Sequence, residues 1–488
     1  MDCEHGGQVD LCIRSLFGAA YFMNQAFEEV MSIRGLERPA TDEVQISGCD
    51  PVLDTRFRIG EACANVLAGV GVAVADIWQL KTARRQSVSV DVRHAAHALR
   101  STHYLQQELA DGSFAEIESA QHKLSSSITQ PWPTRDGRWV LPHFSLPHLC
   151  ERVCKVLECE PNPQSVAKAV ARWNALELED AIAKARGCGA MVRSNQEWLK
   201  HPHGQAVAAQ PLVRITKLGD SDPEPFPQSD RPLGGIRVLD LTRILAGPIA
   251  ARTLAEHGAD VLMIAAQHLP QTAENAIDTS HGKRSCFLDL RRTADAETLR
   301  TLVRDTDVFS QGYRPGVMQG YGFTPQALTE LRPGIVYLTV SCYGLDGPFR
   351  ERAGWEQVAQ TVSGICHEGS DQGPALLPAA ANDYTTGYLG AYGVLLALAR
   401  RARDGGSYHV EVSLCRSAQY IYAQGKTAGD VPHQALSKAD LDALRMRSNP
   451  VHGPFRHLAP VIKLSETPPH WDRPTPVLGS DQPCWLER

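Results

Sequence analysis

The sequence lacks a long uninterrupted apolar run, a signal peptide and a strong excess of charge of either sign. No run reaches the roughly 20 apolar residues that cross a membrane, and the first residues lack a basic segment followed by an apolar one. Lys and Arg number 49 against 55 Asp and Glu, for a net charge of -6. This balance offers no broad basic surface to nucleic acid or anionic lipid. We expect a globular protein with no membrane or nucleic-acid partner, placed in the cytoplasm, with mitochondria and peroxisomes left open.

Cysteine is present without a framework. The chain has 13 cysteines and no Cys-x-x-Cys motif. The odd count without a signal peptide favours a reducing compartment. Cys150, Cys154 and Cys159 lie close to His148 in sequence, but their spacing suits one flank of a helix, where free cysteine packs as a small core residue. We predict no metal site and no metal or redox cofactor.

The chain divides at a polar, proline-rich segment over residues 220–232, which is typical of an extended linker. After it, strand-like runs at 236–241, 260–264, 285–290, 307–310 and 335–340 alternate with helical patterns such as 248–257 and 294–305. This alternation predicts an α/β fold with a doubly wound parallel sheet, a Rossmann-like lobe spanning 233–422. We expect a helix-and-strand segment at 1–100, a smaller α+β domain at 101–219 and a C-terminal extension at 423–488.

Asp383 stands where a polar turn gives way to an apolar helix that runs to Arg401. A carboxylate at a helix start accepts backbone N–H groups and is favoured by the helix dipole. We therefore expect Asp383 to be ionised at neutral pH, and an ionised carboxylate can attack an activated acyl group. The ordinary role of Asp at this position is an N-cap, and the two roles are compatible.

Three loops next to the predicted strands carry residues suited to a phosphorylated ligand. The small residues within 242–248 let a ligand approach the backbone, and 281–284 form a compact cationic segment. Tyr313 and Arg314 lie on a tight turn after the fourth strand. Ligands of doubly wound sheets bind beyond the carboxyl ends of the strands, and Arg pairs bidentately with phosphate. A solvated basic turn is the alternative for 281–284.

In this order and spacing, the segments resemble the class III CoA-transferases, or CaiB/BaiF family, which also includes the α-methylacyl-CoA racemases. The resemblance rests on Gly235–Pro248, His257–Val261, Gly282–Ser285 with Leu288–Leu290, Tyr313–Gly316, Tyr343–Pro348, Asp383 and Gly405–Leu414.

The resemblance assigns the family's nucleophilic aspartate to Asp383. It assigns contacts with CoA to Arg243, Ile244, Leu245, Ala246, Gly282, Lys283, Arg284, Tyr313, Arg314 and Tyr343. It implies transfer of CoA from an acyl-CoA to a carboxylic acid through an aspartyl acyl-anhydride and an aspartyl-CoA thioester. Coenzyme A is then part of the substrate, and the partners are an acyl-CoA and an acid. The family also implies a homodimer, although a fused chain can supply both lobes itself.

The first half departs from the family's order, because it resembles the family's later segment. An ungapped alignment that pairs Val90 with Val410 places Cys63 opposite Asp383. We therefore predict a fused, reordered chain whose first half lacks a nucleophile. Two other functions stay open: an acyl-CoA racemase, and a catalytically silent CoA-binding protein. Trp355 stands where the family's racemases have a histidine after glycine, and it cannot exchange the proton that racemisation requires.

Overall fold

A seven-stranded sheet forms the centre of the computed structural model, which describes residues 25–37, 39–40, 42–117, 119–429, 431–451 and 453–487. All neighbouring strands are parallel except the last pair. In sheet order the strands are β11 (Lys283–Phe287), β10 (Asp260–Ala265), β9 (Arg237–Asp240), β12 (Val308–Gln311), β13 (Val336–Ser341), β14 (Ser407–Ser413) and β8 (Arg214–Gly219).

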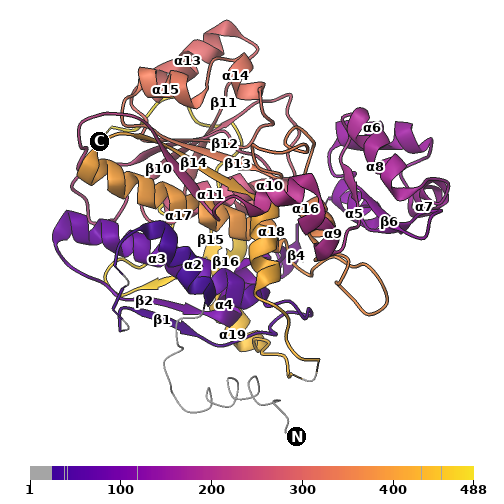
Figure 1. Cartoon of the computed structure of the whole chain (residues 1–488). Coiled ribbons are helices and arrows are strands. Elements are labelled where there is room, and N and C mark those ends of the chain that lie inside the picture. Colours follow the sequence, from indigo (N-terminus) through magenta and orange to yellow (C-terminus); the bar gives the residue numbers. More distant parts are fainter. Residues whose placement is uncertain are drawn as a thin grey trace, which may run out of the picture.

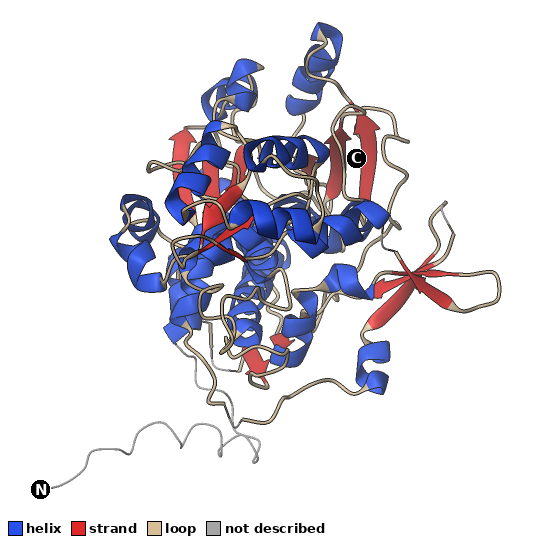
Figure 2. Cartoon of the chain, turned by 90° about the vertical axis from the view of Figure 1, so that its right-hand side faces the viewer, coloured by secondary structure: helices blue, strands red, loops and turns tan. Residues whose placement is uncertain are grey.

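Alternate residues of these strands enter two separate cores. Val238 and Val308 belong to the core shared with α11 and α17, whereas their neighbours Leu239 and Phe309 belong to the core shared with α13 and α15. Both faces are therefore covered, as a parallel sheet requires, and helices surround the strands (Figure 2). The helices of this lobe are α11 (Ala246–Glu256), α12 (Ala273–Asp278), α13 (Thr293–Val303), α14 (Val317–Gly320), α15 (Pro325–Leu331), α16 (Glu356–Ser363), α17 (Ala381–Asp404) and α18 (Leu414–Ala423).

The doubly wound sheet predicted from the sequence is confirmed, with one shift that affects the site. Four of the five predicted strands agree with the structure to within a residue or two at each end. β11 begins at Lys283, two residues before the predicted start. Lys283 and Arg284 therefore belong to a paired strand, in register with Val261 and Leu262, and not to a loop.

A smaller lobe stands beside the main body in Figure 1. It packs its helices on a three-stranded antiparallel sheet around a core of its own. Its elements are α5 (Ala120–Ile128), β5 (Trp132–Pro133), β6 (Trp139–Pro142), α6 (Pro147–Leu157), α7 (Pro163–Val170), α8 (Ala175–Lys184) and β7 (Gly189–Met191). The chain then returns to the main body through α9 (Asn195–Lys200), α10 (Pro202–Ala208) and β8.

The long helix α3 (Ile59–Thr82) lies beside α17 (Figure 1). By length and composition α3 could cross a membrane, which differs from the expectation drawn from the sequence. However, 78% of its most apolar window is buried inside the protein, as expected for a core helix. Around it lie α2 (Gln25–Arg34), β1 (Val44–Ser47), β2 (Val88–Asp91), α4 (Val92–Ala98) and the short 3-10 helix η2 (Ser101–Tyr104).

The first half repeats the end of the large lobe. In both regions two parallel strands flank a 24-residue helix, a further helix follows, and a third strand pairs antiparallel with the second one. The helices begin at Ile59 and Ala381, and the strands after them end at Asp91 and Ser413.

These matched ends fix the alignment of the two copies. Because Ile59 corresponds to Ala381, the third residue of each helix is Glu61 in the first copy and Asp383 in the second. Glu61, not Cys63, is therefore the residue equivalent to Asp383. The alignment predicted from the sequence was wrong by two positions.

Each half completes the sheet of the other. β8, from the first half, is the edge strand of the large sheet, and β17 (Lys463–Leu464) pairs with β2. The rest of the C-terminal extension also joins the body: β15 (Arg445–Ser448) and β16 (Phe455–Leu458), which follow α19 (Lys438–Ala443), form a sheet with β3 (Gln106–Glu108) and β4 (Phe114–Glu116). The last residues run along β11, where Asp481 N donates to Ser285 O at 2.7 Å.

Candidate functional site

Asp383 lies at the boundary between two cavities. The arginine cavity, of about 260 Å³, is lined by residues that follow β9, β12 and β13, together with Leu146, His148 and Leu149 of the first half. The large cavity, of about 710 Å³, is enclosed by residues 100–147 of the first half and 244–383 of the second. The side chains that line both cavities are Leu146, Ile244, Leu245, Trp355 and Asp383. Asp383 is the one ionisable residue among them.

The arginine cavity contains guanidinium groups that lack a counter-ion. Within the described residues, Arg314 forms neither a side-chain hydrogen bond nor an ion pair, and Nε of Arg243 is buried without a partner. Burial lowers the pKa of Arg314, and the nearby Arg186 and Arg152 act in the same direction. Buried cations of this kind favour an anionic ligand, and phosphate groups suit the planar fork of arginine.

The carboxyl group of Asp383 does not cap α17. The helix begins at Ala381, so Asp383 is its third residue, and the carboxyl group accepts no hydrogen bond within the described residues. Glu356, the first residue of α16, takes the capping role instead. It accepts Asp383 N at 2.5 Å through one oxygen and Asn382 N at 3.2 Å through the other.

Ionisation of Asp383 is therefore harder than the sequence implied. Burial raises the pKa of Asp383 well above its ordinary value, and the adjacent carboxyl of Glu356 raises it further. Burial likewise raises the pKa of Glu356 to about 7. The helix terminus does not favour the charge of Asp383 in the way the sequence suggested, because Glu356 already accepts the N–H groups that would have stabilised it. Once ionised, such a poorly solvated carboxylate is a reactive nucleophile.

Most of the predicted CoA-contact residues meet at the arginine cavity. Arg243, Ile244, Leu245, Ala246, Tyr313, Arg314 and Tyr343 line it. Gly282, Lys283 and Arg284 do not line it. Lys283 is fully buried and donates to Asp240 at 2.8 Å and to Pro248 O at 2.9 Å. Asp240 in turn accepts the N–H of Thr242. Lys283 therefore stabilises the 242–248 loop through its bonds to Asp240 and Pro248 O and does not contact the cavity.

Arg284 is likewise committed to the fold. Its guanidinium pairs with Asp260 at 3.1 Å and donates to Cys484 O at 2.8 Å. The sequence reasoning missed Glu356, which the motif Gly354-Trp355-Glu356 contains, and it missed Arg100, which lines the large cavity. Glu356 is revealed by its hydrogen bonds to the start of α17, and Arg100 by its place in the lining of the large cavity. Neither property can be read from a local sequence motif.

Trp355 forms part of the wall between the two cavities. Its ring packs on His143 with centroids 4.5 Å apart. His143 is fully buried, bonds Gln357 at 3.1 Å through Nε2, and has its pKa lowered to about 4 by burial. This imidazole lies outside both cavity linings, so it does not replace the histidine that a racemase needs.

In the first half, the position equivalent to Asp383 is occupied by Glu61, which lines none of the cavities described here. Asp50 accepts Glu61 N at 2.8 Å, as Glu356 accepts Asp383 N, and burial raises the pKa of Asp50 to about 7. Glu61, however, accepts Arg58 at 3.0 Å, and neither carboxyl lines any of the cavities described here. The repeat keeps the capping carboxylate, but Arg58 pairs with the residue equivalent to Asp383.

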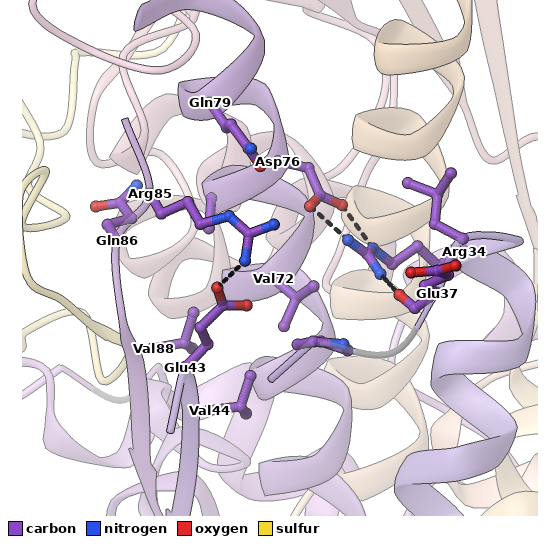
Figure 3. A pocket seen from close by; sticks show the side chains of 13 residues that line it. Arg34, Glu37, Glu43, Val44, Val72, Asp76, Gln79, Arg85, Gln86 and Val88 are labelled. Carbon is purple, nitrogen blue, oxygen red and sulfur yellow. Dashed lines mark hydrogen bonds and ion pairs between the residues drawn. The ribbon is translucent and has the colours of Figure 1, made fainter. Parts of the chain in front are cut away.

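A further cavity, of about 300 Å³, lies between α2, α3 and the β1–β2 sheet (Figure 3). Arg34 donates to Asp76 through two nitrogens, each at 2.7 Å, and Arg85 pairs with Glu43. The arginines labelled in Figure 3 thus point at carboxylates of the same cavity. Its cations are neutralised, unlike Arg314.

Comparison with known proteins identifies the lineage of both halves. The family model for CoA-transferase family III matches residues 25–223 and 233–438. These two matches cover most of the chain and are separated at the predicted linker. The chain belongs to CoA-transferase family III.

Relatives within this family carry transferase names. The acetyl-coenzyme A transferase nodX of Hypoxylon pulicicidum is 31% identical over 320 residues, covering 60% of this chain and 54% of that protein. Human succinyl-CoA:glutarate CoA-transferase is 30% identical over 252 residues, covering 44% of this chain and 57% of that protein. The chain thus spans about half the length of the curated relatives that it matches. A CaiB/BaiF family protein from Brucella suis is 26% identical, covering 46% of this chain and 65% of that one, with a TM-score of 0.38.

Proposed function

We propose that the protein is a CoA-transferase that moves CoA from an acyl-CoA to a carboxylic acid, with Asp383 as the nucleophile. The position of Asp383 between the arginine cavity and the large cavity carries this proposal. On one side, the guanidinium groups of Arg314 and Arg243, which have no counter-ion among the described residues, suit the phosphates of CoA, and the larger space on the other side suits an acyl group. The family and the transferase names of its relatives support the same conclusion.

The reaction follows from a carboxylate placed at this junction. An oxygen of Asp383 attacks the thioester carbonyl, the C–S bond breaks, and an acyl-aspartyl anhydride and CoA thiolate result. The thiolate then attacks the aspartyl carbonyl and releases the donor acid, which leaves an aspartyl-CoA thioester. The acceptor carboxylate attacks this thioester to form a second anhydride, and the thiolate finally attacks its acyl carbonyl, restoring Asp383. The scheme uses no metal or redox cofactor.

Each tetrahedral intermediate requires donors for its oxyanion. The N–H groups of Asn382 and Asp383 already bind Glu356. The start of α11 is the better source, because no side chain caps it and its first residues, Ala246 and Gly247, line the arginine cavity. Unpaired N–H groups of a first helical turn are suited to an anion.

Trapping of the covalent intermediate tests the proposed function. The protein is incubated with an acyl-CoA and then with hydroxylamine, and the peptide that contains Asp383 is analysed by mass spectrometry. We expect an aspartyl hydroxamate in the wild type and none in Asp383→Asn. Deuterium uptake at the α-carbon of the acyl-CoA without any trapped aspartyl species indicates a racemase, and CoA binding without either reaction indicates a silent binder.

A further inference from the structure

The large cavity changes character away from Asp383. The residues it shares with the arginine cavity are apolar apart from Asp383 itself. Arg100, Thr102, His103, Ser119 and Asn275 line the large cavity alone. The large cavity thus offers apolar side chains where it meets the arginine cavity and several polar ones elsewhere in its lining.

Arg100 is the arginine of this polar region. Within the described part of the chain its guanidinium forms no hydrogen bond and no ion pair, and Nε is buried without a partner. The acidic residues in the lining are Asp383 and Glu356, and Glu356 already accepts backbone N–H groups and Gln360. His122, one of the two histidines in the lining, pairs with Glu274 at 2.7 Å. Among the residues that the structure describes, Arg100 thus has no anionic partner.

The segment that carries Arg100 is held rigidly next to the nucleophile. Ser101 donates to the buried Asp278 at 2.5 Å, and Asp278 pairs with Arg252 at 2.8 Å. The hydroxyl of Tyr384, the residue after Asp383, lies 3.0 Å from Ser101 Oγ and accepts Thr102 N at 3.3 Å. One tyrosine side chain therefore connects the start of α17 to η2, and the guanidinium of Arg100, the residue before η2, lines the same cavity as the carboxyl group of Asp383.

We propose that the acid bound in the large cavity carries a second carboxylate, which pairs with Arg100 while its first carboxyl group, free or as the thioester, reacts at Asp383. The substrates would then be dicarboxylic acids and their mono-CoA thioesters, with a methylene chain across the apolar junction. A carboxylate gives the partly buried guanidinium an anion that the described residues do not supply, and it accepts bidentate hydrogen bonds. This inference rests on the proposed CoA-transferase function.

Matched acids measure the effect of the second carboxylate. Adipic and hexanoic acids, and suberic and octanoic acids, are compared as acceptors by kcat/KM. We expect the wild type to prefer each diacid and Arg100→Gln to lower the diacid-to-monoacid ratio roughly ten- to hundredfold, as for a charged hydrogen bond. Arg100→Lys should recover part of the preference, because it keeps the charge without the fork. Arg93→Gln is the matched control, since Arg93 pairs with Asp91 at 2.7 Å outside both cavities.

The failure of this inference differs from failure of the proposed function. A diacid ratio that is the same in the wild type and both Arg100 variants overturns the inference while transfer itself continues. A loss of CoA affinity in Arg100→Gln with an unchanged ratio also overturns it, because Arg100 would then bind the nucleotide. If no acid is a substrate, the proposed function fails. Calorimetric titration of adipic acid then tests the diacid site on its own. Loss of binding in Arg100→Gln supports that site, and equal binding in the wild type and the variant overturns it. If Arg100→Gln does not fold, the same ratios and affinities are measured with Arg100→Lys instead.

Discussion

At the scale of single residues, the site depends on which polar groups are left without partners. The carboxyl group of Asp383 and the guanidinium of Arg314 have no hydrogen-bonding partner among the described residues. Lys283 and Arg284, which the sequence also placed at the ligand, form internal ion pairs with Asp240 and Asp260. An ion pair inside the core uses up the charge that a ligand would need. Availability, not residue type, therefore separates the ligand-binding residues from the structural ones.

Replacement of Asp383 by asparagine is expected to abolish transfer without weakening the fold. The carboxyl group forms no hydrogen bond to lose, and its raised pKa shows that the folded state disfavours its charge. Because the folded pKa lies above the unfolded one, the wild type loses stability as pH rises between them, and asparagine does not. The Tm of Asp383→Asn should equal or exceed that of the wild type at pH 8, with the difference shrinking near pH 4. Transfer at the wild-type rate would remove Asp383 from the mechanism.

Glu356 is expected to set the acidic limb of the pH–rate profile. Transfer requires ionised Asp383, and the Glu356 carboxyl raises the pKa of Asp383 by charge repulsion. Activity should therefore rise with pH, and Glu356→Gln should move that rise to lower pH because glutamine carries no charge. Its one amide oxygen can accept only one of the two backbone N–H groups that Glu356 accepts. A profile measured as kcat/KM against pH checks this. If the acidic limb of the profile stays at the same pH in a folded Glu356→Gln variant, Glu356 does not control the ionisation of Asp383.

Substitutions of Arg314 and Lys283 are expected to affect different properties: CoA binding for Arg314 and stability for Lys283. Arg314→Ala should weaken CoA binding roughly ten- to hundredfold, the range of a charged hydrogen bond, with little change in Tm. Lys283→Met should instead lower stability by about 3–5 kcal/mol, because it leaves Asp240 buried without its cation. Calorimetry with CoA and urea unfolding separate the two effects. Weakened CoA binding in a fully stable Lys283→Met would return Lys283 to the ligand site.

At the scale of elements, the chain uses one supersecondary unit twice with different outcomes. A strand, a 24-residue helix, a strand and a helix recur in both halves, and a carboxylate bonds the N–H of the third helical residue in each copy. In the second copy that residue lines two cavities; in the first, Arg58 neutralises it. The first copy serves as the packing partner of α17, and the segments that follow it in the chain contribute to the walls of both cavities.

The first copy is therefore expected to be dispensable for the chemistry. Glu61→Gln should transfer CoA at close to the wild-type rate, since its carboxyl lies outside both cavities and its partner Arg58 is partly exposed. Cys63→Ser provides a second probe, because Cys63 is a buried core thiol whose pKa burial raises. Steady-state rates and Tm are measured for both. Loss of turnover in a folded Glu61→Gln would indicate a second functional carboxylate.

At the scale of the whole molecule, exchanged strands bind the two family matches into one unit. β8 crosses from the first match to the sheet of the second, and β17 returns from the C-terminal extension to the sheet of the first. Both cavities also take their walls from both halves. The 220–232 linker therefore connects segments that are already joined by backbone hydrogen bonds.

Cooperative unfolding is the expected consequence. Heating should give one calorimetric transition whose van't Hoff and calorimetric enthalpies agree for the main body. A protease site introduced into the linker should yield two fragments that stay associated on a sizing column and keep transfer activity. Two transitions, or separation of the nicked halves in native buffer, would show that the strand exchange contributes little.

The sequence by itself determined the doubly wound sheet, the division at the linker and the position of Asp383. Periodicity, proline-rich composition and the ordered motifs are local, so a linear reading detects them. Only the tertiary structure decided that Glu356 caps α17, that Lys283 lies inside a strand, that Glu61 is the counterpart of Asp383, and that Arg100 shares a cavity with Asp383. Those facts depend on which side chains meet across distant segments and on how burial changes their charges, and neither property is encoded in the spacing of residues along the chain.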